Sequence, residues 1–375
     1  MTADTTTWAE VRALFACSRE LAYLNTATFG PGPEPVLREV RDAIDGWANG
    51  TGNWRVWEER SEDARRGFAR LIGAPAESIA LLPTVSAAAA QVGAGLASPR
   101  GGRSRIVVGH NEFRSNLYPW LALEARGFEV EAVAFRDGAL RVEDVIAAMD
   151  ERTALVAVST VQSSNGYRIE LGALVAACRA NGAQLYLDGT QSIGALRLDL
   201  DGVDYLAVSG YKWLLAPRGT SFLYVAPERL GDLLPAAPGW KTPTDPYQEY
   251  YGPPYDVAPR ASGLDYSLAW PSWVGAAAGL EFLLEVGLDA IEGRNLQLAA
   301  LFREGLAGCG LKPLFAPEHS SQIIGLPLPD ARAAEEALQA RGVVAAVRHG
   351  YLRASFHFFN DETDVERALE ALRSI

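Results

Sequence analysis

From residue 64 to residue 225 the chain alternates short apolar runs with helix-like segments, and this alternation restricts its fold more than any other feature. The apolar runs have the length and composition of buried strands: 79–82, 105–108, 129–133, 154–159, 184–187, 205–208 and 221–225. The segments with helical character lie mostly between them: 64–72, 87–96, 117–126, 142–149 and 171–180. Strands that alternate with helices of this length form a mostly parallel sheet with helices on both faces. The sequence therefore predicts an α/β fold.

A stretch rich in proline, glycine and aromatic residues, 235–260, ends this alternation. Loops of this length are uncommon inside a compact domain and are often functional. The rest of the chain predicts a second set of helices and strands: helices 274–286, 288–306, 331–340 and 361–372, and strands 321–326, 343–347 and 351–355. We therefore expect an N-terminal segment (1–20) that packs with the small domain, a large domain (21–255) and a small α+β C-terminal domain (256–375).

The charge balance argues against two classes of partner. The chain carries 46 acidic and 34 basic residues, a formal net charge of −12, whereas nucleic acids and anionic membranes attract a basic face. No apolar run free of charges and turn signals reaches the roughly 18 residues of a membrane span. The polar, threonine-rich start does not resemble a signal peptide. We therefore expect a globular cytoplasmic protein that binds neither nucleic acid nor membrane.

Cysteine and histidine predict neither a disulfide nor a metal site. The three cysteines, Cys17, Cys178 and Cys309, form no CxxC pair and suit a reducing compartment. The four histidines lack the spacing of metal ligands, and no phosphate-binding glycine motif or GxSxG sequence occurs. The candidate chemistry therefore lies in other residue types.

Lysine is scarce: three lysines occur among the 34 basic residues, and one of them, Lys212, follows the strand 205–208. Asp188 follows the strand 184–187. Ligands of open α/β sheets bind beyond the carboxyl ends of the strands, so both side chains are expected to face one crevice. A buried lysine with a lowered pKa can form a Schiff base with an aldehyde cofactor, and a nearby carboxylate can keep a pyridine nitrogen protonated. From spacing alone, a simple ion pair between the two residues is the competing interpretation.

The segments around these two residues resemble a known signature. Leu187–Gln191 and Val208–Lys212 are similar to the pyridoxal-phosphate motifs of class V aminotransferases, a group that also contains cysteine desulfurases, kynureninase, isopenicillin N epimerase and C–S lyases. Further matches follow in order over nearly the whole chain: Tyr23–Asn25, Thr84–Ser86, Leu352–Ser355 and Phe359–Asn360. The resemblance implies a fold-type I enzyme that works as a homodimer and binds pyridoxal 5′-phosphate (PLP) in its large domain.

The resemblance also implies a role for individual residues. Lys212 forms the Schiff base with PLP and moves the proton at the substrate Cα, while Asp188 pairs with the pyridine nitrogen. Gln191 donates to the ring hydroxyl oxygen, and Phe113 stacks on the ring. Arg353 holds the substrate carboxylate in a bidentate pair. The implied phosphate contacts are Thr84, Val85, Ser86, Ser209 and Tyr211.

Some of these roles have structural alternatives that the residues leave open. Thr84 or Ser86 can cap a helix whether or not a phosphate binds beside it. Phe113 can be an ordinary core aromatic residue. The residue that replaces the usual family asparagine near the ring is also open, and the candidates are Gln162, Ser163 and Asn165.

Further residues are secondary candidates. Arg348 and His357 lie near the Arg353 motif, Arg218 is either structural or close to the dimer contact, and Ser267 is a candidate contact to the phosphate of the neighbouring subunit. The aromatic residues of the long loop and its continuation form either a roof over the pocket or a dimer contact: Trp240, Tyr247, Tyr250, Tyr251, Tyr255, Trp270 and Trp273.

The substrate implied by the resemblance is a small amino-acid-like molecule. Its amine displaces Lys212 from PLP, and the freed lysine removes the Cα proton. Amino transfer is our preferred net reaction, and β-elimination and epimerisation are the alternatives on the same scaffold. A persulfide-forming desulfurase is not expected, because residues 343–352 contain no cysteine. A non-catalytic PLP-binding protein is the alternative from another class.

Overall fold

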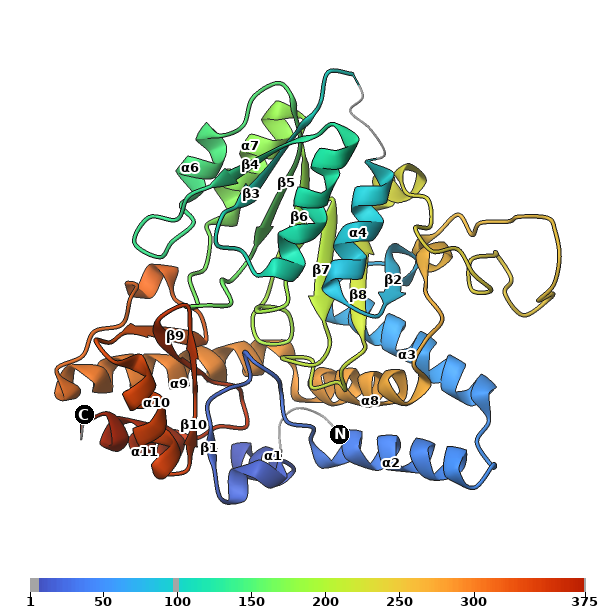
Figure 1. The fold of residues 1–375 in the computed structure, drawn as a ribbon. Coiled ribbons are helices and arrows are strands. Elements are labelled where there is room, and N and C mark those ends of the chain that lie inside the picture. Colours follow the sequence, from blue (N-terminus) through green and yellow to red (C-terminus); the bar gives the residue numbers. More distant parts are fainter. Residues whose placement is uncertain (1–6, 97–100, 374–375) are drawn as a thin grey trace.

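The computed structural model describes residues 7–96 and 101–373. Figure 1 shows a large unit built on a seven-stranded sheet and, beside it, a small unit formed mainly by residues 288–373. A short parallel pairing of β1 (Ala22–Tyr23) with β10 (Val343–Val344) ties the N-terminal segment to the small unit. The predicted α/β fold is confirmed.

The large sheet is mixed but mostly parallel. Its strands are β2 (Ile79–Leu82), β3 (Arg105–Gly109), β4 (Glu129–Val133), β5 (Thr153–Ser159), β6 (Gln184–Asp188), β7 (Tyr205–Ser209) and β8 (Ser221–Val225). They lie in the order β2-β8-β7-β6-β5-β3-β4, with β8 antiparallel to both neighbours and the other pairs parallel. Because β8 runs back along β7, the turn between them lies at the carboxyl end of β7, near the ends of β5 and β6.

Helices surround this sheet on both faces. They are α2 (Glu34–Ala48), α3 (Trp54–Ile72), α4 (Val85–Gly95), α5 (Tyr118–Leu121), α6 (Val142–Ala147), α7 (Leu171–Asn181) and α8 (Trp270–Val286). On one face, Phe68 of α3 stacks on Phe222 of β8 with ring centroids 4.3 Å apart. On the other, Trp120 of α5 packs edge-on against Tyr186 of β6 at 4.8 Å. Burial of such apolar side chains between the layers is the main favourable contribution to this fold.

Three helices of the large unit differ from the prediction, and one of them is α3, which begins at Trp54 and not at residue 64. The helix expected over 117–126 is wrong, since α5 has only four residues and 3₁₀ turns flank it. Gly127 ends the segment with a φ of 88°. Helix α2 was not predicted, although its apolar residues recur on one face and pack against α8.

The small unit packs three helices against a three-stranded antiparallel sheet. The strands lie in the order β11 (Ala346–Arg348), β12 (Tyr351–Ser355) and β9 (Ile323–Pro327), and the helices are α9 (Leu288–Leu306), α10 (Ala331–Ala340) and α11 (Glu362–Leu372). Phe302 and Phe356 are buried in the core between these layers. The strand expected over 343–347 is divided at Ala345, because its first part pairs with β1 and its second part pairs with β12.

Helix α1 (Trp8–Ala13) and the residues after it contact the small unit. Arg12 donates to both carboxylate oxygens of Asp364, at 2.7 and 2.9 Å. The ring of Phe15 stacks on Phe359 with centroids 4.4 Å apart. The domain boundaries predicted at residues 20 and 256 stay predictions, which limited proteolysis can test.

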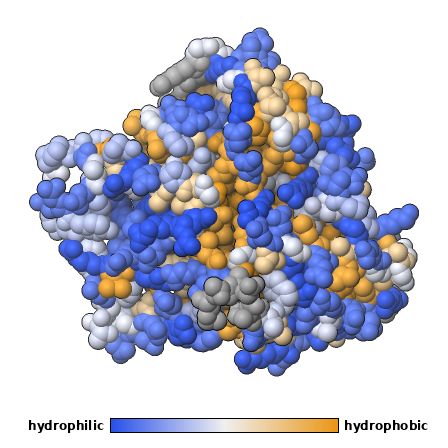
Figure 2. All heavy atoms as spheres, turned by 180° about the vertical axis from the view of Figure 1, so that it is seen from behind, coloured by the Kyte–Doolittle hydropathy of each residue, from blue (hydrophilic) through white to orange (hydrophobic). Residues whose placement is uncertain are grey.

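Seen from the side opposite to Figure 1, hydrophobic residues gather in a band across the middle of the molecule, between hydrophilic margins (Figure 2). Apolar surface is common on folded proteins and needs no membrane to explain it. Within residues 7–96 and 101–373, no helix combines the length and the hydropathy needed to cross a membrane.

Candidate active site

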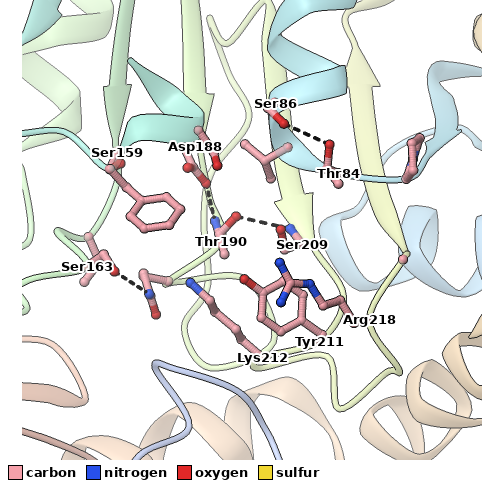
Figure 3. Close-up of a pocket in the computed structure, with 17 residues that line it drawn as sticks. Thr84, Ser86, Ser159, Ser163, Asp188, Thr190, Ser209, Tyr211, Lys212 and Arg218 are labelled. Atoms are coloured by element: carbon pink, nitrogen blue, oxygen red, sulfur yellow. Dashed lines mark hydrogen bonds between the residues drawn. The ribbon is translucent and has the colours of Figure 1, made fainter. Parts of the chain in front are cut away.

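A pocket of about 200 Å³ lies at the carboxyl ends of β5, β6 and β7 (Figure 3). We call it the Lys212 pocket. The structure places all the predicted cofactor contacts on its walls: Thr84, Val85, Ser86, Phe113, Asp188, Gln191, Ser209, Tyr211 and Lys212. Arg353 lines an adjoining cavity that shares Lys212, Phe113 and Tyr211 with the pocket.

Lys212 extends from the β7–β8 turn into this pocket, and its side chain is buried (Figure 3). Within the described part of the chain, no carboxylate lies within salt-bridge distance of its amine, so the simple ion pair with Asp188 is wrong. Burial lowers the pKa of Lys212 to about 8; the carboxylate of Asp188 opposes this shift, and the guanidinium groups of Arg353 and Arg348 add to it. A substantial fraction of the amine is therefore neutral close to physiological pH.

The segment after β1 holds the backbone beside Lys212. The N–H of Gly30 donates to the carbonyl of Tyr211 at 2.9 Å. A Cβ atom at Gly30 would lie 2.1 Å from the carbonyl oxygen of Lys212, so only glycine fits this close approach. Sequence reasoning missed Gly30, because the contact joins segments far apart in the chain.

Asp188 stands at the end of β6 with one oxygen fixed and one available. Its Oδ1 accepts from the N–H of Thr190 at 2.9 Å, and Oδ2 has no hydrogen bond to the described residues. Thr190 Oγ1 in turn accepts from the N–H of Ser209 at 3.1 Å, which ties the ends of β6 and β7 together. Burial raises the pKa of Asp188, against the lowering effects of Thr190 and Lys212.

The start of α4 forms the opposite end of the pocket. Thr84 caps this helix by accepting from the N–H of Ala87 at 3.1 Å, and its hydroxyl lies 3.0 Å from that of Ser86. The N–H groups of Val85 and Ser86 have no hydrogen bond to another described residue, as expected in a first helical turn. Free N–H groups and the helix dipole favour an anion here, so capping and anion binding are compatible.

Phe113 is a wall of the pocket and not a core residue. Its side chain is 51% exposed, and its ring borders both the Lys212 pocket and the adjoining cavity. The amine of Lys212 lies 5.6 Å from the ring centroid. The alternative of an ordinary core aromatic is therefore wrong.

A buried carboxylate that sequence reasoning missed stands behind Phe113. Glu112 accepts from the N–H and the hydroxyl of Ser159, at 2.8 and 2.5 Å, and from Nε2 of Gln162 at 2.8 Å. Ser159 lines the pocket and is the register partner of Asp188 on the neighbouring strand. Burial raises the pKa of Glu112, and the nearby charge of Asp188 acts in the same direction.

Of the three candidates for the family asparagine, the structure places Ser163 in the pocket. Gln162 instead faces Glu112, and the amide of Asn165 donates to the carbonyl of Gly138. The hydroxyl of Ser163 accepts from Nε2 of Gln191 at 3.0 Å. The same nitrogen donates to the carbonyl of Ala27, so the predicted donation of Gln191 to the cofactor requires an exchange of partners.

The adjoining cavity, of about 560 Å³, is lined by Arg218, Arg348 and Arg353 and is called here the arginine cavity. Arg353 is almost fully buried, and Arg348 is exposed. Nη1 of Arg353 donates to the carbonyl of Ser163 at 2.5 Å, and Nη2 donates to Thr28 Oγ1 at 2.5 Å. Burial lowers the pKa of Arg353 to about 9, and the charge of Arg348 adds to this effect.

Of the secondary candidates, the structure places some in the two cavities and others outside them. Arg218 lines both cavities, with its guanidinium carbon 5.4 Å from the ring centroid of Tyr211. His357 is excluded from both: it is fully buried, its Nε2 lies 3.2 Å from the carbonyl of Trp213, and burial lowers its pKa to about 3. Ser267 lines neither cavity, so its contact with a neighbouring subunit stays a prediction.

The aromatic loop does not cover the Lys212 pocket within this chain. Figure 1 shows the segment between β8 and α8 projecting away from the large sheet. Trp240 contacts Trp54 and Tyr247, and Lys241 forms an ion pair of 2.6 Å with Glu58 of α3. Trp273 is buried against the core residue Phe222. The interpretation as a roof formed by the same chain is therefore wrong.

Comparisons with known proteins agree with this architecture. The profile of the family described as "Aminotransferase class-V" matches residues 51–368. The uncharacterized aminotransferase YcbU of Bacillus subtilis is 28% identical over 97% of this chain and 96% of its own. An isopenicillin N epimerase of Streptomyces clavuligerus is 29% identical over 98% of each chain. The apo structure of a cysteine desulfurase from Thermococcus onnurineus NA1 superposes with a TM-score of 0.87 and 22% identity, covering 100% of this chain and 99% of that one. The chain therefore belongs to the class V aminotransferase family of PLP-dependent enzymes.

Proposed function

We propose that this chain binds PLP in the Lys212 pocket and catalyses amino transfer from a small amino-acid-like substrate. The donor set supports the cofactor assignment. The first turn of α4, with the hydroxyls of Thr84 and Ser86, suits a phosphate, and Asp188 Oδ2 is a free acceptor for a protonated ring nitrogen. Lys212 supplies an amine for the cofactor aldehyde. When bound, PLP draws electrons away from the substrate Cα and makes its proton easier to remove.

The residues around the cofactor position have separable tasks. Lys212 Nζ, with a pKa of about 8, takes a proton from Cα and returns it near neutral pH. Thr190 keeps Asp188 oriented by donating to Oδ1. Arg353 holds the substrate carboxylate: its Nε has no partner in the described structure, and its Nη atoms bind only neutral oxygens.

One observation favours amino transfer over epimerisation. Lys212 faces the ring of Phe113 across the pocket, and a phenyl ring carries no titratable proton. Inversion at Cα by two bases needs a second acid on the face opposite the lysine, whereas transfer can use one lysine to move the proton along one face. The single amine of Lys212 therefore supports transfer.

The geometry also supports our expectation that no persulfide forms. The connection between β11 and β12 is a two-residue turn, His349–Gly350, in which both residues have positive φ. This turn leaves no loop that could carry a cysteine to the substrate. Cys17, Cys178 and Cys309 all lie outside the Lys212 pocket and the arginine cavity.

A half-reaction tests the proposal. The purified protein, reconstituted with PLP, is mixed with single amino acids without a keto-acid acceptor. Transfer converts the cofactor to its aminated form and releases one keto acid per site. Ammonia released with the cofactor spectrum unchanged identifies β-elimination, inverted amino acid without keto acid identifies epimerisation, and no reaction with any amino acid identifies a non-catalytic binder. Each of these three outcomes overturns amino transfer.

We also propose a homodimer. The family resemblance supports it, as do exposed aromatic side chains on the long loop, with Tyr250, Tyr251 and Tyr255 exposed by 43%, 84% and 70%. Side chains of this kind are enriched at protein interfaces. Light scattering should give twice the chain mass of 40.3 kDa, and a monomer across the micromolar range overturns the proposal.

A further inference from the structure

Arg348 and Arg353 converge on a single hydroxyl group. Nη2 of Arg353 donates to Thr28 Oγ1 at 2.5 Å, and Nη2 of Arg348 donates to the same oxygen at 3.2 Å. The Thr28 hydroxyl donates its own proton to Asn25 Oδ1 at 2.6 Å. A hydroxyl has two lone pairs and one proton, so its capacity is fully used. Two cations are thus held together by a neutral group.

Neither guanidinium is neutralised within the residues that the structure describes, since no carboxylate lies within salt-bridge distance of either. The other buried arginines of the described chain differ in this respect. Arg65 pairs with Asp265 at 2.6 Å, and Arg294 pairs with Glu362 at 2.5 Å. Buried charges are normally paired, because a lone charge loses its hydration without compensation. Arg353 therefore lacks a counter-charge that an anionic ligand can supply.

Of the three arginines that line the arginine cavity, Arg353 and Arg348 occupy different depths. Arg353 forms its buried end beside Lys212, and Arg348 is exposed at its mouth. A ligand that extends from Arg353 toward the exposed end of the cavity therefore passes Arg348. Since both Nη2 atoms contact one oxygen, the guanidinium groups are close enough for a short dicarboxylate to reach both.

We infer that Arg348, oriented by Thr28, binds a second carboxylate, and that the preferred substrates are acidic amino acids. This inference rests on the proposed PLP site, since it takes Arg353 as the holder of the α-carboxylate. Arg348 then determines specificity: it binds the substrate side chain and leaves the proton transfer at Cα to Lys212. A charge-assisted pair of this kind is specific for carboxylate geometry.

Binding of unreactive acids tests the inference. Calorimetry on the PLP-loaded protein compares succinate and glutarate with propionate and butyrate, for wild type, Arg348→Gln and Arg348→Lys. The matched control is Arg332→Gln, an exposed arginine on α10 that lines neither cavity. We expect wild type to bind a dicarboxylate at least tenfold more tightly than a monocarboxylate. Arg348→Gln should remove this preference and leave monocarboxylate binding unchanged, Arg348→Lys should keep part of it, and Arg332→Gln should keep all of it.

Two outcomes overturn the inference. If Arg348→Gln weakens both classes of acid equally, the two arginines hold one carboxylate between them. If the wild-type protein binds dicarboxylates no more tightly than monocarboxylates, Arg348 does not determine substrate specificity. Because these measurements need no turnover, they are independent of the half-reaction: a protein that prefers dicarboxylates but releases no keto acid loses the proposed amino transfer and keeps this inference.

Discussion

The amine of Lys212 and the ring of Phe113 face each other at 5.6 Å, one from the β7–β8 turn and the other from the loop after β3. Replacement of Phe113 by alanine should weaken PLP binding about fivefold, because an aromatic stacking contact contributes about 1 kcal/mol. Absorption titration of the apoprotein with PLP measures this change. The control is Tyr118→Ala, which removes a similarly exposed aromatic residue that lines neither cavity. Equal affinities of wild type and Phe113→Ala would show that the ring does not stack on the cofactor.

Replacement of Lys212 by alanine should abolish the visible absorption band of the bound cofactor and all amino transfer. The band depends on the covalent bond to a lysine amine, and Lys212 is the lysine in the pocket. Lys312→Ala is the matched control, since this lysine is exposed and lines neither cavity. Survival of the band in Lys212→Ala would mean that another lysine holds PLP.

The rate of PLP uptake by the apoprotein should rise with pH and level off above about pH 8. Only the neutral amine reacts with the aldehyde, and burial lowers the pKa of Lys212 from the usual 10.5 to about 8, so protonation slows the reaction below that pH. Arg348→Gln should move the midpoint to higher pH, because the charge of Arg348 contributes to the lowering. Stopped-flow absorption gives the profile. A wild-type midpoint near 10.5 would contradict the burial argument.

Glu112→Gln should reduce the free energy of unfolding by about 1–3 kcal/mol. The substitution removes a charged acceptor from four hydrogen bonds and turns an amide donor toward the donors of Ser159, Gln162 and Asn116. Urea denaturation followed by circular dichroism measures the loss. Glu124→Gln, at an exposed position nearby, should change stability by less than about 0.5 kcal/mol. A neutral effect of Glu112→Gln would indicate that Glu112 is already protonated in the folded protein.

The sequence was sufficient to predict the parts of the site that depend on one strand and its end. Asp188 and Lys212 were predicted to face one crevice because each lies within four residues of the end of an apolar strand, and the structure places both on the same pocket. Thr84 or Ser86 was expected to cap a helix, and the structure shows that Thr84 caps α4. In each case the local pattern determines where the side chain lies.

The parts that depend on contacts between distant segments were not predictable in this way. Gly30 packs closely against the carbonyl of Lys212, and Thr28 accepts hydrogen bonds from two arginines of the small unit. Glu112 accepts hydrogen bonds from donors on β5 and in the segment after it. None of them stands in a periodic pattern. His357 was misjudged because its sequence neighbourhood does not show that it is fully buried against Trp213.

The hydrogen bond between Thr28 and Arg353 joins residues 325 positions apart, and this separation has a consequence for biosynthesis. The contacts proposed for the cofactor lie between Thr84 and Lys212, so their sheet can be completed once β8 has left the ribosome. The arginine cavity, which we propose binds the substrate, needs Arg353 on β12, which is among the last elements translated. Domains fold as units during synthesis, and such long-range contacts form late. We therefore expect the contacts proposed for PLP to be complete in a nascent chain before the arginine cavity is complete.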